Sequence, residues 1–201
     1  MRPNFRAIPT EFGLALISSR FLSPPHNSSI IVLVGPSGSG KSTVGRAAAL
    51  RLGWRFVDLD REIERRTETT VSEIFSTRGE AFFRGLESDV SVELFTKEEG
   101  GLIIASGGGW VTNSAAMELA LVKSRIIYLK VTPQTALARL GAEQDSRPLL
   151  RGSDPLGSLV RLQMEREEYY TQAHSVINTE VLDLQRVINE VVILAAVYWA
   201  E

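Results

Sequence analysis

The residues best suited to chemistry lie between positions 33 and 45, where the sequence reads LVGPSGSGKSTVG. Gly35, Gly40, Lys41 and Ser42 fill every fixed position of the phosphate-binding pattern G-x-x-x-x-G-K-[ST]. The glycines let the loop turn its backbone N–H groups inward, which forms an anion-binding nest at a helix N-terminus. We therefore predict a nucleoside triphosphate site with Mg²⁺ beside the serine hydroxyl. Its predicted phosphate contacts are Gly38, Ser39, Gly40, Lys41, Ser42 and Thr43.

The elements around this loop predict the fold. The β-branched run SIIVLV (29–34) is typical of a buried strand, and KSTVGRAAALRLG (41–53) of an Ala/Leu-rich helix. Further strands are expected at 55–58, 102–106, 125–129 and 175–178, and the first at 30–34. Helices are expected at 41–52, 60–66, 71–77, 80–97, 113–122, 133–140, 155–173 and 182–199. This alternation predicts an α/β fold with a parallel sheet between two helical layers.

The composition narrows the class of protein. A chain of 201 residues is long enough for one domain with a sizeable core. The net charge of −2 indicates no nucleic-acid surface, and the lack of cysteine excludes disulfides, thiolate zinc sites and cysteine nucleophiles. No apolar run approaches the roughly 18–20 residues that span a bilayer, so we expect no membrane segment. We expect a monomer in the cytoplasm.

Residues 1–29 differ from the rest of the chain. They contain three arginines and one acidic residue, Glu11, and they end in a Pro/Ser/Asn-rich stretch. The apolar part FGLALI is too short for a secretory signal. We expect a poorly ordered N-terminal extension ahead of a domain at 30–201. An organelle transit peptide, and with it a plastid or other organelle location, is the alternative.

Two carboxylates at the end of the second strand are candidates for the acceptor side of the reaction. In VDLD (57–60), strand alternation puts Asp58 and Asp60 on one side if the extended form persists. The carboxyl edge of a parallel sheet lies close to a bound triphosphate. One carboxylate can then hold Mg²⁺ through water, and the other can accept a hydrogen bond from a substrate hydroxyl. Alternatively, Asp60 is only the N-cap of the next helix.

Arginines and glycines further along fit an anionic acceptor. In FFRGLESDV (82–90), Arg84 and Glu87 meet on one helix face, and their apolar neighbours indicate partial burial. A guanidinium held in this way presents a fork that suits a carboxylate. The run Gly107 to Gly109 permits positive φ and close approach of the backbone to a ligand, with a bare turn as the alternative.

A polar segment near residue 150 is a candidate lid. SRPLLRGSDPLG (146–157) lies between two helical patterns and carries Arg147 and Arg151. We expect a lid at about 141–156 that folds over the phosphates. Arg166 follows on a long helix in MEREEYYTQA (164–173), where a lone arginine is more often solvated than bound to a ligand.

Taken together, six motifs carry a family resemblance. In order they are GPSGSGKST, DLD, FRGLE, GGG, RPLL and REEYY, spread over roughly residues 29–180. This series resembles the shikimate kinases, whose P-loop fold is similar to that of nucleoside-monophosphate kinases. The resemblance implies a five-stranded parallel sheet with a lid. It also implies Mg²⁺-dependent transfer of the γ-phosphate of ATP to the 3-hydroxyl of shikimate, in the biosynthesis of chorismate and aromatic amino acids.

The resemblance also implies roles for individual residues. Arg84 and Arg166 would hold the carboxylate of shikimate, and Asp60 would bind ring hydroxyls and accept the proton of the attacking hydroxyl. Glu87 would hold the arginines in place, and Gly108 and Gly109 would approach the substrate through backbone N–H groups. Phe75 and Phe83 would form apolar walls. The implied substrate contacts are Asp60, Phe75, Phe83, Arg84, Glu87, Gly107, Gly108, Gly109 and Arg166.

On the nucleotide side, the resemblance implies that Arg147 swings in with the lid toward the transferring phosphate. Arg139 would stack against adenine, and Ser42 and Asp58 would form the magnesium environment. Lys41, Asp60 and Arg147 would then be the catalytic residues.

Two positions in the motifs depart from the family pattern, and two other functions stay open. Trp110 follows the glycines where a small residue is usual, and Glu168 replaces a proline. The alternatives are a gluconate-type or nucleotide kinase of similar fold, and a non-catalytic ligand-binding module of a regulator. The leader is too short, and too poor in helical periodicity, for a DNA-binding helix-turn-helix.

Overall fold

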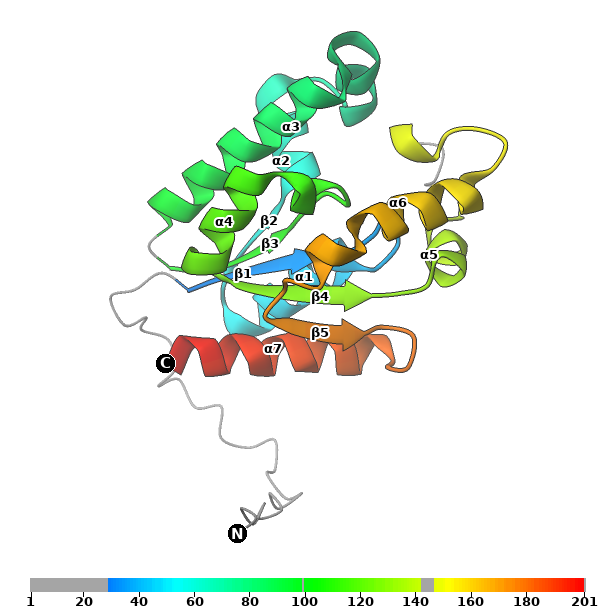
Figure 1. The fold of residues 1–201 in the computed structure, drawn as a ribbon. Coiled ribbons are helices and arrows are strands. Elements are labelled where there is room, and N and C mark those ends of the chain that lie inside the picture. Colours follow the sequence, from blue (N-terminus) through cyan, green and yellow to red (C-terminus); the bar gives the residue numbers. More distant parts are fainter. Residues whose placement is uncertain (1–28, 99, 142–146, 201) are drawn as a thin grey trace.

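A computed structural model describes residues 29–98, 100–141 and 147–200 (Figure 1). The predicted N-terminal extension lies outside the described residues except for Ser29, and so do residues 142–146 of the predicted lid. Within the described part, no helix is long and apolar enough to cross a membrane.

Five parallel strands form one sheet in the order β2-β3-β1-β4-β5. The strands are β1 (Ser29–Val34), β2 (Arg55–Asp58), β3 (Gly101–Ala105), β4 (Arg125–Lys130) and β5 (Ser175–Asn178). All five match the predicted strands to within one residue at each end. The central strand β1 is buried along its length, as expected of a strand covered on both faces.

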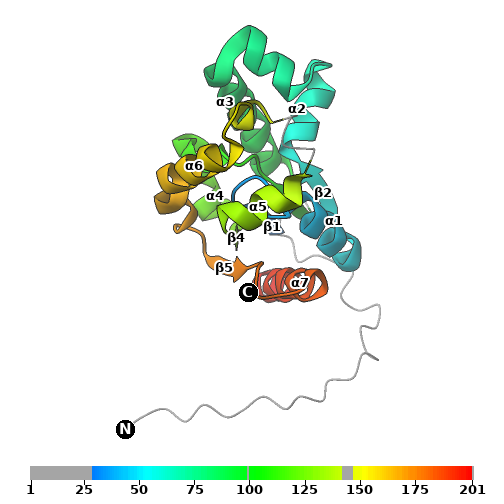
Figure 2. The ribbon, with the colours of Figure 1, turned by 90° about the vertical axis from the view of Figure 1, so that its right-hand side faces the viewer.

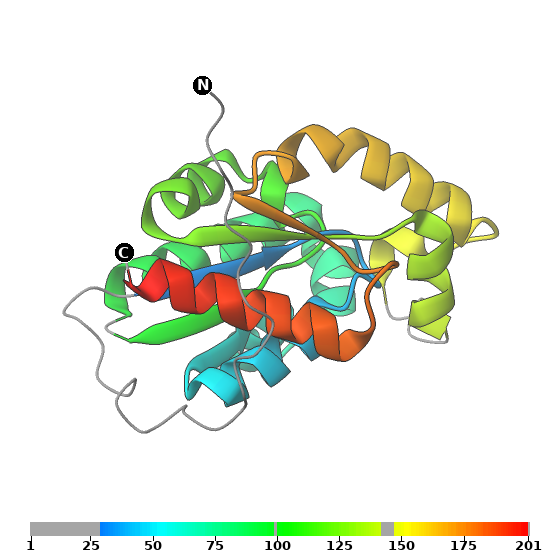
Figure 3. The ribbon, with the colours of Figure 1, turned by 90° about the horizontal axis from the view of Figure 1, so that it is seen from below.

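Helices cover both faces of the sheet. They are α1 (Lys41–Leu52), α2 (Leu59–Thr67), α3 (Val71–Lys97), α4 (Ser114–Lys123), α5 (Pro133–Leu140), α6 (Pro155–Tyr170) and α7 (Leu184–Ala200). Alternate side chains of β1 separate the two halves of the core. Ile30, Val32 and Val34 belong to the half that contains residues of α3 and α4. Ile31 and Leu33 belong to the half that contains residues of α1 and α7. Figure 2 shows α7 nearly end-on below the sheet, and Figure 3 shows its length across that face. The predicted three-layer α/β/α fold is confirmed.

One helix prediction is confirmed in an unexpected form and another needs correction. The break expected between helices at 71–77 and 80–97 is present, because Gly79 (φ 81°, ψ 170°) has non-helical geometry and marks a kink within α3. The helix expected at 155–173 ends at Tyr170. Beyond it, the N–H groups of Gln172 and Ala173 bond to carbonyls three residues back, which closes tight turns in place of a further helical turn.

The region after β2 also differs from the prediction. The strand ends at Asp58, so Asp60 lies in the first turn of α2 and the extended alternation does not persist. The alternative in which Asp60 caps α2 is wrong as well. Asp58 is the N-cap, because its Oδ1 accepts a hydrogen bond from the backbone N–H of Arg61 at 3.3 Å.

Candidate active site

The loop between β1 and α1 has the backbone geometry of an anion-binding nest. Gly35, Gly38 and Gly40 have φ values of 142°, 81° and 92°, which residues with a side chain rarely adopt. At Gly38, a Cβ atom would lie 2.3 Å from the carbonyl oxygen of Ala136. Glycine is therefore required at this position by both conformation and space.

Lys41, at the start of α1, is folded back onto this loop. Its Nζ donates hydrogen bonds to the carbonyl oxygens of Gly35 and Pro36, both at 2.8 Å, and to Ser39 Oγ at 3.4 Å. Burial, aided by the nearby charge of Arg147, lowers the pKa of Lys41 to about 7. A bound triphosphate would restore the charged form, because an adjacent opposite charge favours it.

Ser42 and Asp58 form a pair with the chemistry of a partial Mg²⁺ site. Ser42 Oγ donates to Asp58 Oδ2 at 2.5 Å. Among the residues that the structure describes, no group of three or more His, Cys, Asp or Glu side chains is arranged to hold a metal. Magnesium in phosphate-transfer sites is commonly held by one or two protein groups together with phosphates and water. The hydroxyl–carboxylate pair fits that arrangement with a nucleotide present.

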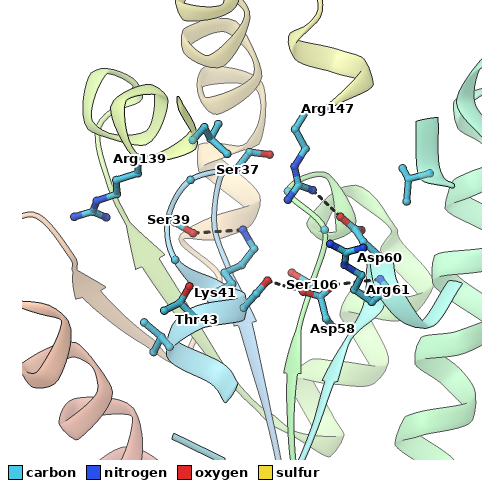
Figure 4. A pocket seen from close by; sticks show the side chains of 18 of the residues that line it. Ser37, Ser39, Lys41, Thr43, Asp58, Asp60, Arg61, Ser106, Arg139 and Arg147 are labelled. Atoms are coloured by element: carbon cyan, nitrogen blue, oxygen red, sulfur yellow. Dashed lines mark hydrogen bonds and ion pairs between the residues drawn. The ribbon is translucent and has the colours of Figure 1, made fainter. Parts of the chain in front are cut away.

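Asp60 and Arg147 meet across the same space. Arg147 Nη1 lies 2.9 Å from Asp60 Oδ2, which joins the lid region to the first turn of α2 (Figure 4). Burial raises the pKa of Asp60 above its usual value, the charge of Asp58 adds to this, and Arg147 opposes it. The predicted catalytic residues Lys41, Asp60 and Arg147 thus lie around one cavity.

This cavity has a volume of about 950 Å³ and is open to the phosphate loop. Arg139 lies on the side of the loop away from Asp60 (Figure 4), and its guanidinium donates to Thr179 Oγ1 and to the Thr179 carbonyl, each at 2.8 Å. The sequence-predicted site residues that line the cavity are Gly38, Ser39, Gly40, Lys41, Ser42, Thr43, Asp58, Asp60, Gly107, Gly108, Arg139 and Arg147.

The glycines after β3 are required for a reason other than the predicted one. Gly107, Gly108 and Gly109 do not have positive φ values. The predicted close approach to a ligand stays a prediction, and in the structure it is protein side chains that lie against Gly107 and Gly109. A Cβ atom at Gly107 would lie 2.5 Å from Glu87 Oε1 and 3.0 Å from Asp60 Oδ1, and one at Gly109 would lie 2.2 Å from Arg84 Nη2. The glycine loop therefore brings Asp60, Glu87 and Arg84 close together.

Arg84 is held between two carboxylates on α3. Its Nη1 pairs with Glu87, and its Nη2 lies 2.7 Å from Glu80 Oε1. The Arg84 side chain is 18% exposed and that of Glu87 is 0% exposed, so the predicted burial of the pair is confirmed. Burial raises the pKa of Glu87 to about 7 despite the arginine. Glu87 Oε1 has no hydrogen-bond partner within the described structure, so this carboxyl group is only half satisfied.

The other predicted acceptor residues are Phe75, Phe83 and Arg166. Phe75 and Phe83 pack with ring centroids 5.0 Å apart, and the Arg84 guanidinium lies 5.6 Å from the Phe83 ring. Arg166 lines a small hollow together with Ser37 and other residues of the phosphate loop and α6. Neither Arg84 nor Arg166 lines the large cavity. Even so, the charge of Arg166 lowers the pKa values of both Glu87 and Lys41. Arg166 therefore lies close enough to act on the phosphate loop and on the Arg84–Glu87 pair.

The structure also explains Trp110 and reveals a contact that the sequence did not predict. Trp110 begins the short helix η2 (Trp110–Thr112), is fully buried, and donates from Nε1 to Ser91 Oγ at 2.9 Å. It therefore anchors the glycine loop to α3. After η4 (Pro148–Leu150), Arg151 Nη2 donates to Ser72 Oγ at 2.5 Å, which ties the lid region to the start of α3. No local pattern marks Ser72, because the contact depends on how the lid region packs.

Comparisons with known proteins agree with this geometry. The family model described as shikimate kinase matches residues 37–195. The shikimate kinase of Moorella thermoacetica is 40% identical over 161 residues, which cover 80% of this chain and 91% of that protein.

Solved structures give the same result. A shikimate kinase from Acinetobacter baumannii in complex with shikimate has a TM-score of 0.78 and 35% identity, covering 84% of this chain and 93% of the other. The shikimate kinase from Bacteroides thetaiotaomicron has a TM-score of 0.75 and 32% identity, covering 83% and 97%. A gluconokinase from Sinorhizobium meliloti, with a TM-score of 0.53 and 16% identity over 85% and 92%, shares the fold alone.

The phosphate loop follows β1, the central strand of a β2-β3-β1-β4-β5 sheet, and cationic side chains converge on it. This arrangement defines a P-loop kinase fold. The family model extends over most of the domain, from within the phosphate loop to α7. The chain belongs to the shikimate kinase family.

Proposed function

We propose that this protein transfers the γ-phosphate of ATP to the 3-hydroxyl of shikimate, giving shikimate 3-phosphate and ADP. The observation that carries the proposal is the convergence of Lys41, Asp60 and Arg147 on the cavity at the phosphate loop. The glycine loop links this group to Arg84, which supplies a cation for an anionic acceptor. The family relationship supports the same reaction.

The nucleotide would occupy the large cavity. Its β- and γ-phosphates would meet the loop N–H groups, and Lys41 would exchange its carbonyl partners for phosphate oxygens. Arg139, held by Thr179, would contact the base. Mg²⁺, held by Ser42 and Asp58, would neutralise charge on the phosphates. Arg147 lines the same cavity and would approach the transferring phosphoryl group.

The acceptor would lie against the glycine loop. Arg84 and Arg166 would bind its carboxylate, with Glu87 holding Arg84 in place, and Phe75 and Phe83 would close the apolar side of the ring. Asp60 would release Arg147 and accept the proton of the attacking hydroxyl. Phosphoryl transfer depends mainly on positioning and charge neutralisation, and these residues provide both. Closing of the lid segment at about 141–156 would exclude water as a competing acceptor.

We further propose that the protein acts as a cytoplasmic monomer on these two small molecules, without nucleic acid or membrane partners. An organelle location is the alternative if residues 1–29 prove to be a transit peptide. Gel filtration with light scattering tests the oligomeric state. Fusion of residues 1–29 to a reporter protein tests the extension as a targeting signal.

A coupled ADP-release assay tests the reaction, with shikimate, quinate, gluconate and AMP offered side by side. The proposal expects turnover with shikimate far above the other three acceptors, and loss of that turnover in EDTA. Preferred phosphorylation of gluconate or AMP would contradict it. Tight binding of shikimate without any turnover would instead indicate the non-catalytic module.

A further inference from the structure

Tyr170 connects the helix that carries Arg166 to the glycine loop. It is the last residue of α6 and is 1% exposed. Its hydroxyl donates a hydrogen bond to the backbone carbonyl of Gly108. This contact lies at the junction between the candidate nucleotide and acceptor sites, because Gly108 lines the large cavity and Gly109 lies against Arg84.

The Tyr170 ring is fixed from the other side by residues of β4 and α6. It stacks on Tyr128 with a centroid distance of 4.9 Å and an interplanar angle of 17°. Tyr128 donates to Glu167 Oε2 at 3.0 Å, and Glu167 Oε1 lies 3.1 Å from Lys130 Nζ. These contacts leave the Tyr170 hydroxyl little freedom. The stacked ring therefore fixes the position from which the Tyr170 hydroxyl meets the loop.

The hydrogen bond to the Gly108 carbonyl sets the orientation of the peptide group between Gly108 and Gly109. The described peptide bonds include no cis bond, and in a trans peptide the C=O and N–H groups point in opposite directions. Since the Gly108 carbonyl points toward Tyr170, the N–H of Gly109 points away from it. Arg84 packs against the Cα of that same glycine. The residue that carries this N–H group is therefore also the residue against which the Arg84 guanidinium lies.

Arg166 lies four residues before Tyr170, so the two share one face of α6. Burial raises the pKa of Tyr170 to about 12, while the charge of Arg166 and a hydrogen bond from it act in the opposite direction. The hydroxyl therefore keeps its proton near neutral pH and remains a donor. Tyr170 stands between Arg166 and the loop that lies against Arg84.

We propose that Tyr170 is a positioning residue for the acceptor site: its hydroxyl orients the Gly108–Gly109 peptide so that the Gly109 N–H and the two arginines form one anion site. The inference deepens the proposed function and rests on it. It assigns Tyr170 an effect on acceptor binding that is separate from its packing in the core, and the Phe variant separates the two because it keeps the ring.

Steady-state kinetics of Tyr170→Phe provide the test. Loss of one hydrogen bond that orients a donor predicts a shikimate KM raised about three- to tenfold, with the ATP KM within about twofold of wild type. Tyr169→Phe is the matched control, because Tyr169 is 40% exposed and adjacent, and its KM values should stay at wild type. Tyr128→Phe, which keeps the stack and loses the bond to Glu167, should have a smaller effect than Tyr170→Phe.

Two results would overturn the inference: an unchanged shikimate KM in a folded Tyr170→Phe variant, or equal increases for both substrates. A second measurement uses the wild-type chain and does not depend on how the variant folds. The amide resonance of Gly109 should shift on titration with shikimate, while that of Gly53, at the distant end of α1, should not. No shift at Gly109 would also overturn the inference. Failure of the wild-type chain to phosphorylate shikimate would contradict the proposed function itself. Wild-type kinetics therefore distinguish failure of the proposed function from failure of the inference about Tyr170.

Discussion

Arg147 Nη1 and Asp60 Oδ2 lie 2.9 Å apart, so the cation expected to meet the transferring phosphate is paired with the carboxylate expected to accept the hydroxyl proton. In this arrangement Asp60 takes the place expected for a phosphate oxygen beside Arg147, and Arg147 takes the place expected for a substrate hydroxyl beside Asp60. We expect binding of ATP and shikimate to separate them, since phosphate would compete for Arg147 and a ring hydroxyl for Asp60. The ion pair thus satisfies both side chains in the absence of the two substrates.

Replacement of this carboxylate should affect turnover more than binding. We predict that Asp60→Asn lowers kcat by at least about 100-fold, because general-base groups contribute roughly this much, while ATP affinity stays close to wild type. Asp183→Asn, which changes an exposed carboxylate at the start of α7, is the matched control. Initial rates together with nucleotide titrations decide the matter. Near-normal kcat in Asp60→Asn would remove Asp60 from the mechanism.

Loss of the acceptor cation should affect shikimate selectively. Hydrogen bonds to charged groups are worth about 1.5–3 kcal/mol. Arg84→Ala should therefore weaken shikimate binding by about 10- to 100-fold with ATP binding nearly unchanged. Arg78, on the same helix but beyond the Gly79 kink, lies over the Phe82 ring, and its Ala variant is the control. Calorimetric titration of each ligand measures the effect. Weaker ATP binding with intact shikimate binding would show that the assignment of Arg84 is wrong.

The proposed magnesium pair predicts a specific metal dependence. Ser42→Ala and Asp58→Asn should each raise the Mg²⁺ concentration needed for half-maximal rate by several-fold, because each removes an oxygen that suits the ion. ATP binding measured in EDTA should change little. A magnesium titration of the initial rate at saturating substrates gives the comparison. If both variants keep the wild-type Mg²⁺ requirement, the metal is held elsewhere.

Glu87 gives the chain a predicted pH dependence. Burial raises the pKa of Glu87 from its usual 4.5 to about 7 in the folded protein. At pH values between these two, the folded state therefore binds a proton that the unfolded state does not. This contribution is therefore most favourable at low pH and is lost as pH rises through about 4.5 to 7. Glu87→Gln cannot titrate, so its stability relative to wild type should increase by up to roughly 3 kcal/mol across that window.

Urea unfolding of wild type and Glu87→Gln at pH 5 and pH 8 checks this sign. Comparing the two proteins cancels the titration of groups remote from Glu87, among them Glu62, whose pKa is lowered to about 2 by Arg65. A difference in stability that stays constant with pH, or that changes in the opposite direction, would contradict the burial argument.

The strands and the phosphate loop were predictable because their signals are local. Apolar β-branched runs such as Ile30 to Val34 indicate buried strands wherever they occur, and the loop pattern fixes its own backbone conformation. The spacing of the later motifs carried the family resemblance. These features required no knowledge of how distant segments pack.

The errors arose where a helix cap or a tertiary contact decides the outcome. Alternation from Asp58 to Asp60 failed because Asp58 satisfies the first turn of α2, and that cap ends the strand. The glycines at 107–109 were predicted for positive φ and for close approach to a ligand, whereas their φ values are not positive, and Glu87, Asp60 and Arg84 pack against Gly107 and Gly109. Trp110 departs from the family pattern but fills a site in the core beside Ser91. None of these contacts leaves a periodic trace in the sequence.

A structure of the protein with shikimate and a non-hydrolysable ATP analogue would test the central claim most directly. We predict that the ring carboxylate lies between the guanidinium groups of Arg84 and Arg166. The 3-hydroxyl should lie within hydrogen-bond distance of Asp60 and face the γ-phosphate, with Arg147 moved from Asp60 to the phosphate. A ring bound with its carboxylate away from both arginines, or an Arg147–Asp60 pair that persists beside both ligands, would contradict the account.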